Sequence, residues 1–106
     1  MKNEITQTEI FSIWLKGLTD KIALARINAR LDYAKCGNFG DCKPIGGGLS
    51  EMRIHYGPGY RIYYGQIGES LYLLLAGGIK DAQRRDIDKA VELWKDIKEH
   101  GGHDEK

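Results

Sequence analysis

The stretch LSEMRIHYGPGYRIYYGQ, residues 49–66, decides the fold that we expect for this chain. Its first part alternates, so that apolar and polar side chains fall on opposite sides of an extended strand. The apolar set is Met52, Ile54 and Tyr56, and the polar set is Glu51, Arg53 and His55. Residues 57–59, Gly-Pro-Gly, indicate a turn, and the alternation resumes over residues 60–64. The pattern predicts a β-hairpin.

A central strand and a closing helix are predicted after the hairpin. Gly68 allows a second turn before Leu-Tyr-Leu-Leu-Leu at 71–75, an apolar run typical of a strand buried on both faces. Gly77 and Gly78 are expected to end that strand. From about Asp81 onward, apolar residues return at helical spacing: Ile87, Ala90, Val91, Trp94 and Ile97.

A strand and two helices are predicted before the hairpin. Residues 3–7 favour a short strand, Thr8 can cap a helix to about Leu18, and Asp20 can cap a second helix to about Lys35. Five glycines and Pro44 make residues 36–49 rich in turns, with one short edge strand around 41–45. The predicted fold class is α+β, with two N-terminal helices and a C-terminal helix packed on a small, mostly antiparallel sheet.

Length and composition are those of one globular domain. The chain has 106 residues, of which 42% are hydrophobic and 29% charged, so we expect one domain over 1–100 and a flexible tail at 101–106. No apolar run approaches the ~20 residues of a membrane span, and the N-terminus lacks a secretory signal pattern. A cytoplasmic protein is therefore expected. Cys36 and Cys42 match neither a disulfide framework nor a CxxC pair, and we expect free thiols.

The polar side of the hairpin is where chemistry is expected. A sheet face that packs on helices should be apolar, so a polar row predicts that this face is open to solvent. Neighbouring strands lie about 4.8 Å apart, which would bring Arg53 close to Arg61, and two guanidinium groups fit a phosphate diester well. The structural alternative is that Glu51 neutralises these arginines as a cross-strand ion pair. The row comprises Glu51, Arg53, His55, Arg61 and Tyr63.

Other catalytic chemistries find little support in the sequence. A metal site is not predicted, because there is no HExxH pattern and the pair His100 and His103 lies in the expected tail. A nucleophilic triad is not indicated either, since there is no GxSxG motif. A metal-free ribonuclease needs only a base for the ribose 2′-hydroxyl, cations for the charge on phosphorus and an acid for the leaving oxygen. Those residue types are present, and no cofactor is expected.

Three segments resemble a known family. They are FSIWLKGLTDKIALARINARL (11–31), GNFGDCKPIGGGLSEMRIHYGPGYRIYYGQ (37–66) and LYLLLAGGIKDAQRRDIDKA (71–90). They look like the HigB-like addiction module killer branch of the RelE/ParE toxin superfamily, most specifically in GPGYRIYY and GGIKDAQRRDI. The resemblance implies a curved sheet and the toxin of a type II toxin-antitoxin system. It also implies an endoribonuclease that cuts mRNA on the ribosome without a metal ion.

The resemblance implies catalytic roles for four residues. Arg61 and Lys80 would stabilise transition-state charge, and Arg53 would serve charge or proton transfer. His55 would act as general acid or base, because the ordinary pKa of histidine is about 6.5. Relatives of this branch often carry an acidic residue where His55 stands. The alternatives are a surface histidine at position 55 and a solvated lysine at position 80.

RNA contacts are expected from Arg26, Arg30, Tyr63 and Gln83. Gln83 or Asp86 occupies the stretch in which some members of the superfamily place a tyrosine over the scissile bond. For the two helical arginines, a solvated helix face is the structural alternative.

The partners implied by the resemblance are mRNA on the ribosome and a helix-turn-helix antitoxin, in a complex that could be a higher oligomer. An acidic antitoxin segment is expected to bind the same basic face or to displace an element beside it. The alternative function is a ParE-like gyrase poison or an inactive antitoxin-binding module, which the fold alone does not separate from a nuclease. On an open face, Arg61→Ala should abolish cleavage and leave the fold intact.

Overall fold

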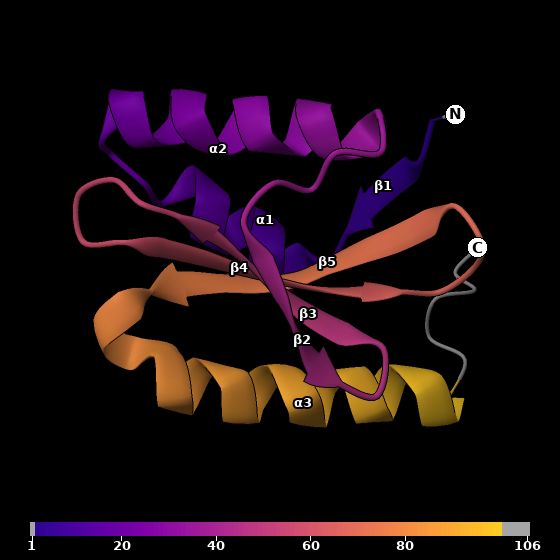
Figure 1. The fold of residues 1–106 in the computed structure, drawn as a ribbon. Coiled ribbons are helices and arrows are strands. Elements are labelled where there is room, and N and C mark those ends of the chain that lie inside the picture. Colours follow the sequence, from indigo (N-terminus) through magenta and orange to yellow (C-terminus); the bar gives the residue numbers. More distant parts are fainter. Residues whose placement is uncertain (1, 101–106) are drawn as a thin grey trace.

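The computed structural model describes residues 2–100, which form three layers (Figure 1). Helices α1 and α2 cover one face of a five-stranded sheet, and α3 covers the other. The predicted α+β class is confirmed, whereas the predicted tail at 101–106 lies outside the described residues. The elements are β1 (Glu4–Gln7), α1 (Glu9–Lys16), α2 (Lys21–Lys35), β2 (Cys42–Gly46), β3 (Leu49–Ile54), β4 (Tyr60–Gln66), β5 (Leu71–Ile79), the 3₁₀ turn η1 (Lys80–Ala82) and α3 (Gln83–His100).

The sheet is mostly antiparallel, as predicted, and has the strand order β1-β5-β4-β3-β2. The predicted hairpin is β3 and β4, in which Arg53 lies directly opposite Arg61. β5 runs antiparallel to β4, whereas β1 joins the far side of β5 in parallel. The apolar run at 71–75 therefore lies inside the sheet, where the sequence placed it.

The two predicted helix caps are confirmed. The Thr8 hydroxyl accepts a hydrogen bond from the Phe11 amide at 3.1 Å. Asp20 Oδ1 accepts from the amides of Ile22 and Ala23 at 3.0 and 3.2 Å. Both caps satisfy amides that have no carbonyl partner within their own helix. No helix within residues 2–100 has the length and apolarity needed to cross a lipid bilayer.

The prediction that Gly77 and Gly78 end the central strand is wrong. β5 continues to Ile79 and stays paired with β4 through both glycines. A Cβ on Gly77 would lie 2.3 Å from the Trp14 ring, and one on Gly78 would lie 1.9 Å from Asp86 Oδ2. The two glycines therefore let α1 and α3 approach opposite faces of the same strand.

The prediction that the polar side of the hairpin is open is also wrong. The core between the sheet and α3 contains Leu49, Tyr63, Leu73, Leu75, Ala90 and Trp94. Glu51 and Arg61 are buried on this face and hydrogen-bond each other. A central strand that is apolar on both sides needs cover on both sides, and α3 supplies it on this one. The face toward α1 and α2 buries Met52, Ile54 and Ile62, as the alternation predicted.

Candidate functional site

One group of predicted site residues gathers under the start of α3, and we call it the Glu51 cluster: Glu51, Arg53, Arg61, Tyr63 and Gln83. Arg61 Nη1 donates to Glu51 Oε2 at 2.9 Å, and their side chains are only 9% and 3% exposed. Gln83 Nε2, from the first turn of α3, donates to the same carboxylate oxygen at 2.6 Å. The structural alternative from the sequence, a cross-strand pair between Glu51 and an arginine, is therefore confirmed.

Two polar atoms of the Glu51 cluster lack a hydrogen-bond partner among the described residues. They are the Tyr63 hydroxyl and Arg53 Nε, both inaccessible to solvent. Burial raises the pKa of the Tyr63 phenol far above its usual value; the carboxylates of Glu51 and Asp86 add to this effect, and Arg61 opposes it. Tyr63 is thus a neutral, fully buried phenol in this conformation, not the exposed RNA contact that the sequence predicted.

A second group lies at the exposed end of the hairpin. His55 Nε2 lies 2.5 Å from Asp41 Oδ2, and the two side chains are 71% and 47% exposed. The hydrogen bond with His55 is the chief cause that lowers the pKa of Asp41; His55, Arg53 and Arg30 also lower it through their charges, while desolvation opposes the shift. A carboxylate that accepts from Nε2–H holds the ring in one orientation and leaves Nδ1 with a free lone pair.

This His55–Asp41 dyad opens on a pocket of about 240 Å³, the dyad pocket, which is lined by Arg26, Ala29, Arg30, Ile54 and His55. The structure thus brings together three of the predicted site residues, from α2 and from the end of β3. Arg26 is exposed, and its guanidinium lies 4.9 Å from the centre of the Tyr56 ring. Arg26 is therefore available to an anion in the pocket.

Arg30 has a structural task in the same place. Its guanidinium donates to the carbonyls of Arg53, Phe39 and Asp41 at 2.5, 3.0 and 3.0 Å. These bonds hold the segment before β2 against the end of β3, so that Asp41 meets His55. The sequence did not predict this role. Helical spacing shows on which face of α2 the Arg30 side chain lies, but not which carbonyl groups it binds.

Lys80 belongs to neither group by any contact that we observe within residues 2–100. It is exposed on η1, and its backbone amide donates to the Gly59 carbonyl at 2.7 Å, which ties the start of η1 to the hairpin turn. Asp41 is the residue that sequence reasoning missed. It lies 14 residues from His55 in a turn-rich segment, and no spacing rule predicts such a pair. Within the described residues, no three His, Cys, Asp or Glu side chains gather where they could hold a metal ion.

Comparison with known proteins gives one informative match. No family model matches this chain. A curated protein of Haemophilus influenzae, described as uncharacterized, is 40% identical over 97 residues, which cover 92% of this chain and 98% of that protein. The two proteins belong to one family. The match to the Haemophilus protein runs over nearly its full length, so the family is defined by the whole domain and not by one segment. Its description assigns no activity.

Proposed function

We propose that this protein is the toxin of a type II toxin-antitoxin system, a RelE/HigB-like endoribonuclease that cleaves mRNA on the ribosome, in the cytoplasm, without a metal ion or cofactor. The observation that carries the proposal is the exposed His55–Asp41 dyad beside the exposed guanidinium of Arg26. A proton acceptor held by a carboxylate and a cation in one open pocket are what cleavage of a phosphodiester requires. The resemblance described above supplies the substrate class.

The dyad can begin the reaction at the ribose. His55 Nδ1 takes the proton of the 2′-hydroxyl while Asp41 holds Nε2–H and stabilises the imidazolium that forms. The 2′-oxygen then bonds to phosphorus, and the bond from phosphorus to the 5′-oxygen breaks. The leaving 5′-oxygen takes a proton from water, because the pocket is open to solvent, and the hydroxide ion so formed takes up the proton held by His55. Arg26 stabilises the charge that develops on the phosphoryl oxygens. The products are a 2′,3′-cyclic phosphate and a free 5′-hydroxyl.

The resemblance gives Arg61 the role of stabilising charge in the transition state, and this role would require a conformational change. For Arg61 to contact a phosphate, Gln83 and the first turn of α3 would have to leave Glu51. The dyad pocket demands no such movement. We therefore assign proton transfer to the dyad and the positive field around it to Arg53, whose charge acts on Asp41, while Arg61 stays paired with Glu51 and Lys80 remains an exposed cation on η1.

The test is induction of the protein in cells followed by mapping of the new 5′ ends of transcripts. His55→Ala and Asp41→Asn should each lower cleavage by about 10²–10⁴-fold, the usual contribution of a positioned acid or base. His100→Ala is the matched control, because His100 is also 71% exposed and lies 2.9 Å from a carboxylate oxygen of Asp96 on α3. It should cleave like the parent. Cleavage that survives both dyad variants would contradict the proposed mechanism.

A second candidate function is a ParE-like gyrase poison, or a module that only binds an antitoxin. The observation that favours it is the burial of Arg61, which is only 7% exposed although the resemblance gives it a catalytic role. The same induction experiment separates the two, since a gyrase poison leaves transcripts intact and provokes DNA damage. Intact transcripts without DNA damage would indicate a module that only binds an antitoxin.

A further inference from the structure

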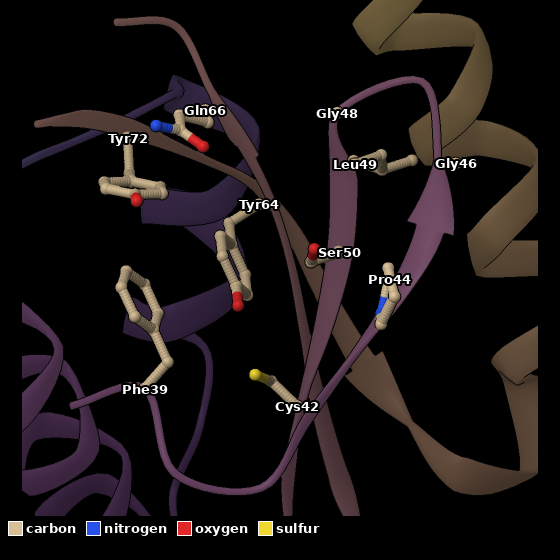
Figure 2. A pocket seen from close by; sticks show the side chains of 10 residues that line it. All are labelled: Phe39, Cys42, Pro44, Gly46, Gly48, Leu49, Ser50, Tyr64, Gln66 and Tyr72. Atoms are coloured by element: carbon tan, nitrogen blue, oxygen red, sulfur yellow. The ribbon is translucent and has the colours of Figure 1, made fainter. Parts of the chain in front are cut away.

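A second pocket, of about 290 Å³, lies at the side of the sheet that faces α1 and α2, near the edge strand β2 (Figure 2). We call it the aromatic pocket. Six of its lining residues carry the argument: Phe39, Cys42, Ser50, Tyr64, Gln66 and Tyr72. None of the predicted site residues lines this pocket, and it has no part in the proposed mechanism.

The aromatic rings of this pocket form flat walls. The rings of Phe39 and Tyr64 are stacked, with centroids 5.1 Å apart and planes at 11°. The Tyr72 ring is tilted against both, 4.8 Å from Phe39 and 6.2 Å from Tyr64. Figure 2 shows Tyr64 between these two rings on one side and Ser50 and Cys42 on the other. Because these rings already contact one another, an occupant can stack only on an outward ring face, and a planar ring suits such a face best.

The polar atoms of the aromatic pocket are uncharged, and some have a fixed orientation. Gln66 Nε2 donates to the carbonyls of Gly68 and Glu69 at 3.0 and 3.3 Å, so the side-chain oxygen remains as an acceptor. Burial and a hydrogen bond with Cys42 raise the pKa of the Tyr64 phenol, which therefore keeps its proton at neutral pH. No Lys, Arg, Asp or Glu lines the pocket.

A short segment joins the aromatic pocket to the dyad pocket. Phe39 and Cys42 line the first, and Asp41, between them in sequence, holds His55 at the second. Arg30 holds the carbonyls of both Phe39 and Asp41. The segment 39–42 therefore contributes both to the lining of the aromatic pocket and to the position of His55 in the dyad pocket.

We propose that the aromatic pocket is a nucleobase subsite, which takes one unstacked base of an RNA whose adjacent phosphodiester lies in the dyad pocket. The RNA part of this inference rests on the proposed function. An uncharged aromatic lining suits a base. The cations that a phosphate needs, Arg26 and Arg30 of α2, line the dyad pocket instead. A volume at the low end of ligand pockets fits one base and no more.

The chain offers a direct probe of occupancy, because its two cysteines, Cys36 and Cys42, are both exposed and only Cys42 lines the aromatic pocket. In a Cys36→Ser variant, the rate of Cys42 alkylation by iodoacetamide is measured with and without adenosine, guanosine, cytidine or uridine. At least one nucleoside, at about ten times its Kd, should slow the reaction roughly tenfold, because only the unoccupied pocket reacts. In the reciprocal Cys42→Ser variant, the same nucleoside should leave the rate at Cys36 unchanged.

Two pocket variants test the rings themselves. Phe39→Leu and Tyr72→Leu, each in the Cys36→Ser background and checked for folding by circular dichroism, should abolish protection by the nucleoside. Tyr33→Leu is the matched control, because Tyr33 is an aromatic side chain on α2 that is 60% exposed outside the pocket. Its protection should equal that of the parent. Protection that persists in both pocket variants would overturn the proposal.

The cleavage assay separates this inference from the proposed function. If both hold, Phe39→Leu changes which base is preferred beside the mapped 5′ ends. If nucleosides protect Cys42 but no transcript is cut, the base site stands and the nuclease fails. The base site is overturned if cleavage depends on His55 while no nucleoside protects Cys42 and Phe39→Leu leaves the base preference unchanged. It is also overturned if nucleosides give no protection and an antitoxin alone protects Cys42, because the pocket then docks a protein.

Discussion

Removal of the Arg61 guanidinium would leave the Glu51 carboxylate buried with Gln83 as its one remaining side-chain partner in the described structure. Arg61→Ala should therefore lower the free energy of unfolding by about 3–5 kcal/mol, the cost of a buried charge that loses its counterion. The sequence led us to expect that this variant keeps its fold, because the polar side of the hairpin was predicted to be open to solvent. The burial of Arg61 corrects that expectation. Urea denaturation followed by tryptophan fluorescence measures the change.

Arg84→Ala is the control for that measurement, because Arg84 is an exposed arginine on α3. It should change the free energy of unfolding by no more than about 0.5 kcal/mol. A loss of under about 1 kcal/mol in Arg61→Ala, typical of exposed pairs, would show that the Arg61–Glu51 pair is solvated.

The Asp41 carboxylate should titrate below its ordinary value, chiefly because it is hydrogen-bonded to His55. A carboxyl whose pKa is lower in the folded protein contributes stability above its unfolded pKa and loses it as the pH falls through the folded pKa. The contribution of the Asp41 carboxylate is therefore fully present above about pH 3.9, the ordinary pKa of aspartate, and is lost as the pH falls below it. His55→Ala should raise the pKa of Asp41, as measured by carbon NMR of the carboxyl group. An unchanged pKa would mean that the dyad does not form in solution.

The sequence predicted part of this site. Alternation along the hairpin was enough to put Arg53 opposite Arg61 and to offer Glu51 as their counterion. It could not show Asp41 against His55, because that contact depends on Arg30, which binds two carbonyls of the turn-rich segment and one carbonyl of β3. Charge is visible in a sequence, whereas the partner of a charge is set by tertiary packing.

At the scale of elements, the glycines of β5 allow close packing on both faces of the sheet. Gly77→Ala would force a Cβ into the Trp14 ring at 2.3 Å, so α1 has to move. We expect a loss of about 1–3 kcal/mol in the free energy of unfolding, typical of overpacking. Gly68→Ala is the control, since its Cβ would meet only Leu71 at 3.7 Å. Equal stability of the two variants would contradict this account of the strand.

These glycines also explain why the end of β5 was mispredicted. Paired glycines usually interrupt a strand, and only the approach of Trp14 and Asp86 reveals a different purpose. The helix caps and the hairpin were predictable because their signals are local. The cover that α3 gives to the hairpin was not, because an apolar helix face does not specify which sheet face it meets.

At the scale of the whole molecule, the proposed function predicts how the antitoxin recognises its toxin. If an acidic segment of the antitoxin competes with RNA for the exposed cations, Arg26→Glu and Lys80→Glu should weaken binding and make the remaining affinity less dependent on salt. Isothermal titration at several ionic strengths measures both effects. Lys95→Glu, an exposed lysine on α3, is the matched control. Unaltered affinity in the first two variants would place the antitoxin elsewhere on the surface.

The parallel pairing of β1 with β5 has a consequence for the timing of synthesis. β1 comes near the start of the chain, yet its ladder partners are residues 71–74, and the Thr8 amide also donates to the Leu74 carbonyl. Roughly 60 residues must therefore be translated before β1 can join the sheet, which takes roughly 3–12 s at ordinary bacterial speeds. Until then the first strand has no place to dock, and the sheet that supports both pockets is incomplete. In a nascent chain the five-stranded sheet thus stays incomplete until most of the protein has emerged.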